Sequence, residues 1–71
     1  MTTLRLHRAV YAGDAVDEAV KVFAPYATFE LLEEPEHWVV QVHGGDRERR
    51  IAGEVGNYAL GLTVQRGGVA C

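Results

Sequence analysis

The sequence has few residues of the kinds that form disulfides or zinc sites. It contains a single cysteine, Cys71, so no disulfide can form within the chain. The lone cysteine and the three scattered histidines also disfavour a structural zinc site, which usually takes four Cys or His ligands. These shortages predict a domain with no metal and no cofactor.

Positive charge and long apolar runs are scarce as well. The formal net charge is −3, whereas a nucleic-acid-binding domain normally carries a basic face. No apolar run approaches the roughly 20 residues that a membrane-spanning helix needs. The N-terminal segment lacks the apolar core of a signal peptide. We therefore expect no nucleic-acid partner, no membrane insertion and a cytoplasmic location.

The chain is also short. Its 71 residues form a single small domain, 1–71, and a chain of this size buries only about 60% of the surface that it exposes when unfolded. Small domains often gain stability from disulfides, a metal or a second chain. Because the first two are not expected here, we expect association with another chain, either as a homodimer or with a different protein.

Alternating apolar residues predict three strands. In the first, over 3–11, Leu4, Leu6 and Val10 share one face. The segments 26–32 and 37–43 alternate in the same way, and the short turn between them predicts an antiparallel hairpin.

Two helices are predicted from apolar residues at helical spacing. The first covers 14–24, with Asp14 as the expected N-cap and Pro25 ending it. The second begins after Asp46 and ends at the glycines at 67 and 68.

The expected order of elements is therefore β-α-β-β-α. A right-handed crossover through the first helix gives strand order 2-3-1, counted along the chain, with both helices on one face. This is an α+β fold, arranged like a ferredoxin-like domain that lacks its last strand. The first strand, which carries Leu4 and Leu6, is expected to have an open edge at the place where the missing last strand would pair with it.

The last helix carries two stripes. One is a seam expected to cover the sheet, formed by Ile51, Val55, Tyr58 and Leu62. Beside it, a stripe of small residues is formed by Ala52, Gly56, Ala59 and Thr63. Gly53, Gly56 and Gly61 each cost about 1 kcal/mol relative to alanine in a helix, which predicts the close approach of another backbone. Either the first helix or a second chain can supply that backbone.

No set of residues predicts catalysis. Cys71 follows two glycines and has no evident neighbouring base. His37 and His43 lie about 20 Å apart on one strand, so they cannot share a metal ion. We therefore expect a protein that is not an enzyme.

Two charged segments each allow two interpretations. The arginines Arg47, Arg49 and Arg50 follow two glycines and could attract an anion, but a capped turn into the last helix accounts for the same residues. The acidic segment 33–36 is either a solvated turn or a docking spot for a basic partner. In both cases the structural interpretation is favoured.

The last helix also resembles the HxsD family, small proteins of the His-Xaa-Ser peptide-modification system. That family carries a pattern near LLNDYxLRE. Asn57 stands at its acidic position, and Tyr58 and Leu60 match its tyrosine and leucine. Gly56, Gly61 and Leu62 depart from the pattern, which has Asn, Arg and Glu at these positions. The resemblance extends to the first helix and to the strand at 37–43.

The resemblance implies a non-enzymatic accessory protein that acts beside radical SAM enzymes on a precursor peptide. Any iron–sulfur cluster would belong to those partners. A peptide or an enzyme is expected to bind either at the free edge of the first strand or on the small-residue face of the last helix. The residues expected to take part are Leu4, Leu6, Ala52, Gly56, Asn57, Tyr58, Ala59 and Leu60.

Overall fold

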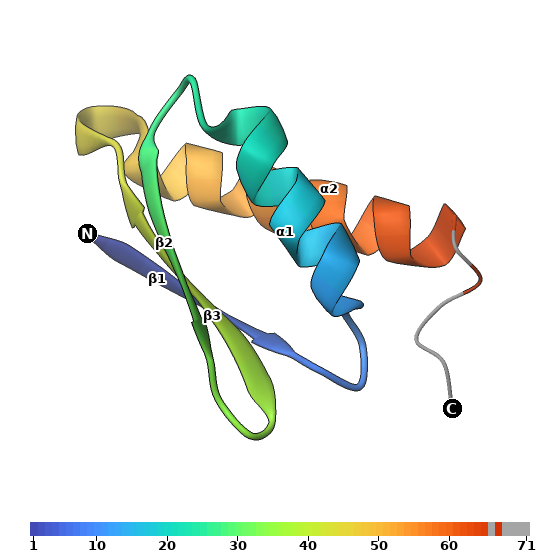
Figure 1. Cartoon of the computed structure of the whole chain (residues 1–71). Helices are drawn as coiled ribbons and strands as arrows, with labels where there is room; N and C mark the ends of the chain where they lie inside the picture. The colour runs from blue at the N-terminus through green and yellow to red at the C-terminus, as the bar shows by residue number, and fades with distance from the viewer. Residues whose placement is uncertain (66, 68–71) are drawn as a thin grey trace.

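A three-stranded antiparallel sheet and two helices make up the computed structural model, which describes residues 1–65 and 67 (Figure 1). The central strand pairs with both others, so the sheet order is β1-β3-β2. This confirms the predicted α+β fold and strand order. The elements in order are β1 (Thr2–His7), α1 (Gly13–Phe23), β2 (Thr28–Glu33), β3 (His37–His43), the short 3-10 helix η1 (Gly45–Arg47) and α2 (Glu48–Gln65).

Both helices cover one face of the sheet (Figure 1). The register places Leu4 opposite Val40, and Phe29 opposite Val42, and opposed residues of an antiparallel pair project to the same face. Val40, Val42 and Leu6 join residues of both helices in one hydrophobic core. The other face of the sheet has no helix over it among the described residues.

The helices pack against each other through small side chains. The buried members on the two helices are Ala15, Ala19, Ala52 and Ala59. Alanine lets two backbones approach closely, and α2 accordingly packs against α1 as well as on β1 and β3. The first helix is therefore the close neighbour of the small stripe at Ala52 and Ala59.

The first strand is shorter than predicted. It ends at His7, because the Val10 and Tyr11 N–H groups both donate to the His7 carbonyl, at 2.9 and 3.0 Å, and this bonding turns the chain. Val10 is then half exposed and lies outside the core. The prediction of a strand continuing to Tyr11 was wrong.

Both helix starts also differ from the prediction. Ala12, not Asp14, is the N-cap residue of α1, and its N–H donates to Thr63 Oγ1 at 3.1 Å. Thr63 in turn donates to the Ala59 carbonyl at 2.8 Å. This contact between α2 and the β1–α1 loop fixes the residue at which α1 begins, whereas Asp14 lies in the first turn and accepts a bond from the Ala15 N–H at 3.0 Å. Asp46 lies within η1.

The loop before α1 is fastened to β3 by Trp38. The indole Nε1 donates to the Tyr11 carbonyl at 3.0 Å, and the Arg8 guanidinium lies 4.2 Å from the ring centroid. A Cβ on Gly13 would lie 2.6 Å from Trp38 Cζ2, so this position requires glycine. These contacts fix the loop that follows the C-terminal end of β1 against β3.

Candidate functional site

The outer edge of β1 is the candidate site, because its backbone groups have no strand partner in residues 1–65 and 67. The Arg8 N–H donates to the Glu36 carbonyl at 2.9 Å, and these two residues continue the register of the β1–β3 ladder. Bonded and non-bonded pairs alternate along an antiparallel ladder. The backbones of Thr3, Arg5 and His7 therefore point outward, whereas the even-numbered residues bond to β3.

Most of the outward groups are available to an added strand. The His7 carbonyl accepts bonds from Val10 and Tyr11, so it is satisfied locally. The N–H and C=O of Thr3 and Arg5, together with the His7 N–H, remain for a partner. Such a row of unpaired groups is the template on which another strand adds.

β2 is also an edge strand, but its side chains are more exposed than those of β1. All its residues are exposed except the partly buried Phe29, whereas Leu6 of β1 is buried and Leu4 is partly buried. α2 packs on β1. A strand added beside β1 would therefore place alternate side chains next to α2, which makes β1 the better binding edge.

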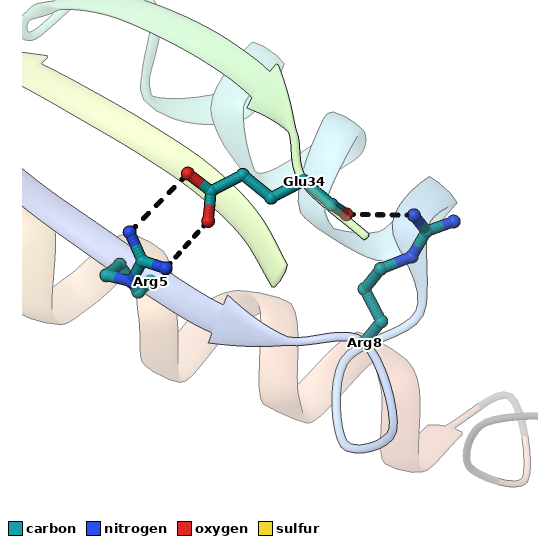
Figure 2. Close-up of polar contacts among 3 residues, drawn as sticks. All are labelled: Arg5, Arg8 and Glu34. Carbon is teal, nitrogen blue, oxygen red and sulfur yellow. Dashed lines mark hydrogen bonds and ion pairs between the residues drawn. The ribbon is translucent and has the colours of Figure 1, made fainter. Parts of the chain in front are cut away.

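On the uncovered face, Arg5 ties β1 to the hairpin turn (Figure 2). Its Nη2 and Nη1 atoms lie 2.7 and 3.5 Å from the two carboxylate oxygens of Glu34. Arg8 Nη1 donates to the backbone carbonyl of the same glutamate at 3.0 Å (Figure 2). Arg5 and Arg8 thus both bind Glu34 in the turn between β2 and β3, one through its carboxylate and the other through its backbone carbonyl. The Arg5 side chain is still 56% exposed.

The histidines of β1 and β3 lie opposite each other on this face. The rings of His7 and His37 are 5.0 Å apart in an edge-to-face arrangement, and His7 Nδ1 accepts a bond from the Ala9 N–H at 3.1 Å. No group of three or more potential metal-ligating side chains occurs in the part of the chain that the structure describes. Cys71 lies outside the described residues.

Near the start of β1, the carboxylate of Glu48 in α2 contacts three hydrogen-bond donors. Its Oε1 lies 2.8 Å from the N-terminal amine nitrogen and accepts a bond from the Thr2 hydroxyl at 2.7 Å. Its Oε2 accepts a bond from the Gly44 N–H at 3.2 Å. The hydrogen bond from the amine, followed by that from Thr2, lowers the pKa of Glu48 from 4.5 to about 2. β1 is therefore anchored to α2 at its start and to the hairpin turn farther along.

The small-residue stripe of α2 is mostly internal. Ala52 and Ala59 are 2% and 0% exposed, so neither side chain can contact a partner. Gly56 is only partly buried, and a Cβ there would meet no atom within 4 Å, as at Gly53 and Gly61. The expected close approach of a backbone is therefore absent at all three glycines within the described chain.

The family-like residues of α2 do not form one surface. Tyr58 is 39% exposed, and its ring packs edge-to-face on Phe23 of α1, at 5.8 Å between centroids. Gly56 and Leu60 lie one turn apart on another side, since residues two apart in a helix do not face the same way. Asn57 is exposed. The predicted seam is therefore rotated: Tyr58 packs on α1, and Ala52, Ala59 and Thr63 join Ile51 and Val55 as the buried residues of α2.

Val64 is an exposed apolar residue that the sequence patterns did not predict to be part of a surface. Val64 is 67% exposed and lies one turn beyond Leu60, which is 38% exposed. The spacing of four residues was visible in the sequence, but only the observed orientation of α2 shows that both side chains face outward.

Comparisons with known proteins identified no family: no family model matches the chain, and no characterised protein or solved structure does either. Among the described residues, no helix is long and apolar enough to cross a bilayer.

Replacing Gly56 with alanine tests the open space at this position. We expect stabilisation by up to about 1 kcal/mol, because alanine is the better helix former and its Cβ meets nothing within 4 Å. Urea unfolding measures the change, and Gly13→Ala, whose Cβ would clash with Trp38, should be destabilised. A loss of stability in Gly56→Ala that depends on protein concentration would instead place another chain against Gly56.

The Glu48 anchor predicts a pH-dependent stability. Because the folded pKa lies below the ordinary value, the carboxylate stabilises the fold above pH 4.5, and this contribution is lost as the pH falls from 4.5 to about 2. In urea unfolding across this range, Glu48→Gln should be less stable than the parent at neutral pH and converge with it in acid. Glu30→Gln, which removes an exposed carboxylate of β2, should keep the parent profile. A constant difference between Glu48→Gln and the parent would contradict the anchor.

Proposed function

We propose that this chain is a non-enzymatic adaptor that captures an extended peptide segment on the outer edge of β1. The single observation that carries the proposal is the row of outward N–H and C=O groups at Thr3 and Arg5, on a strand pinned at Glu48 and Glu34. Backbone bonds would supply affinity, and the flanking side chains would supply selectivity.

The anchors matter because binding has an ordering cost. Each flexible side chain that becomes fixed on association costs about 0.5–1.5 kcal/mol, and the ordering of loops adds to this cost. β1 is already fixed in the free protein by Glu48, Arg5 and the ladder to β3. A partner strand therefore loses less of its binding energy to ordering than it would on a frayed edge.

The nature of the partner rests on the HxsD resemblance at Asn57, Tyr58 and Leu60. It favours a precursor peptide, or a segment of a radical SAM enzyme that modifies such a peptide, in the cytoplasm. The adaptor would hold the peptide, while the enzyme supplies the iron–sulfur cluster and the chemistry. Tyr58 and Asn57, which are exposed on α2, would then contact the enzyme rather than the peptide.

Thr3→Pro tests the peptide-binding edge. The Thr3 N–H points away from β3, so proline removes a donor needed by an added strand without breaking the ladder; edge strands tolerate proline in this position. Binding of the precursor peptide or enzyme encoded beside this chain, measured by isothermal titration, should weaken about tenfold. Thr3→Val keeps the N–H and should bind like the parent.

Two results of this titration would contradict the proposal at different levels. Equal binding by Thr3→Pro and Thr3→Val would rule out the outer edge of β1 as the binding surface. No binding of the parent chain to any neighbouring peptide or enzyme would rule out the adaptor function itself. Circular dichroism of Thr3→Pro confirms that the chain tested is folded.

Self-association as a homodimer is a second candidate, favoured by the exposed Leu60 and Val64 on α2. Their neighbours Gly53 and Gly56 leave open space that a second helix can enter. Light scattering at high micromolar concentration should then give twice the chain mass, and Val64→Glu should return the monomer. A monomer for the parent chain at that concentration would exclude this candidate.

A further inference from the structure

A hollow of about 410 Å³ lies between the end of α1 and the start of α2, away from the edge of β1. No residue of β1 lines it, and neither the adaptor function nor the dimer accounts for it. Its lining combines apolar, cationic and acidic side chains: Phe23, Tyr26, Arg47, Arg50, Ile51 and Glu54.

The apolar part of the hollow is held in place by the core. Ile51 is buried in the core cluster, and Phe23 packs against that cluster. The Phe23 ring also lies 6.2 Å from the Tyr26 ring. Tyr26 itself is 69% exposed, so one aromatic ring stands uncovered beside a fixed apolar wall. This arrangement suits a flat or branched apolar group, because aromatic rings gain energy from offset or edge-on contacts.

The cationic part of the hollow makes few interactions within the chain. Arg5 pairs with Glu34, Lys21 pairs with Asp17, and Arg8 lies over Trp38. Arg47, in contrast, makes no ion pair within residues 1–65 and 67, and neither does Arg49, which does not line the hollow. Arg50 has only a 3.6 Å contact with Glu54, and its side chain is 81% exposed. Two guanidinium groups thus line one hollow of a chain whose net charge is −3.

We propose that this hollow binds a carboxylate attached next to a large apolar group, as in an N-acylated aromatic amino acid or the C-terminal residue of a peptide. The apolar group lies against Phe23 and Tyr26, and the carboxylate pairs with Arg47 and Arg50. Guanidinium groups match a carboxylate with directional, charge-assisted bonds, and pockets of this kind combine an apolar wall with a few polar groups.

Glu54 adds selectivity to the site. Its carboxylate lines the same hollow beside Arg50, where it accepts the amide N–H of an acylated ligand and repels a second acidic group. The expected ligand therefore carries one negative charge and one N–H donor. For an open hollow and a ligand of amino-acid size, we expect a dissociation constant on the order of 1 mM.

Chemical-shift titration of the ¹⁵N-labelled protein tests the site with N-acetyl-L-phenylalanine as the probe. Saturable shifts are expected at Phe23, Tyr26 and Ile51. N-acetyl-L-phenylalaninamide, which has the same ring but no carboxylate, should bind about tenfold more weakly. An acetylated tripeptide that ends in a free phenylalanine carboxylate distinguishes a peptide C-terminus from an N-acylated amino acid as the ligand. If the tripeptide binds, the site accepts peptide C-termini. If it does not bind, the site accepts only the N-acylated amino acid.

Arg47→Gln and Arg50→Gln should each weaken the acid by about fivefold to tenfold. Arg49→Gln is the matched control, because Arg49 is an exposed arginine of the same helical turn that does not line the hollow. All three side chains are exposed, so the variants should fold.

Three outcomes would overturn the proposal: equal affinity for the acid and its amide, an equal loss in Arg49→Gln, or shifts that do not saturate at tens of millimolar. None of them bears on the edge of β1, which Thr3→Pro tests separately.

Discussion

The close packing of α2 on α1 and β1 is the contact on which the rest of the structure depends. It is possible because the buried side of the helix carries Ala52, Ala59 and Thr63 around Val55, so that the backbones approach without a clash. The same approach brings the Thr63 hydroxyl to the Ala12 N–H, which fixes the loop between β1 and α1. Larger side chains on this stripe would move α2 away from both neighbours.

This packing also determines the state of the β1 edge. Near its start, α2 presents Glu48 to the N-terminal amine and to Thr2, and the hairpin turn holds the middle of the strand through Arg5. Edge strands are often protected by bulges, proline or charge. Here the outward groups of Thr3 and Arg5 lie on a strand that contacts Glu48, Glu34 and β3. These contacts favour strand addition over a purely structural role.

Local signals in the sequence predicted the elements and their order, including the bounds of β3 at 37–43. Hydrogen bonds that the apolar pattern does not encode decided the rest. The end of β1 depends on local bonds from Val10 and Tyr11 to the His7 carbonyl, and the start of α1 is held by a bond from the Ala12 N–H to Thr63, 51 residues away. Of the predicted site residues, Leu4, Gly56, Asn57, Tyr58 and Leu60 keep some exposure, whereas Leu6, Ala52 and Ala59 are buried. The direction of each backbone group, and the gathering of Arg47 and Arg50 in one hollow, follow from register and helix placement, which no short pattern encodes.

Residue-resolved hydrogen exchange is the most direct test of the open edge. In the free protein, the amides of Thr3, Arg5 and His7 should exchange rapidly, while those of Leu4 and Leu6, which bond to β3, should be protected. Addition of a peptide that binds this edge should slow the exchange of the Thr3 and Arg5 amides and leave the exchange of the Leu4 and Leu6 amides unchanged. Protection of Thr3 and Arg5 in the free chain, or rapid exchange at these residues in the complex, would contradict strand addition at β1.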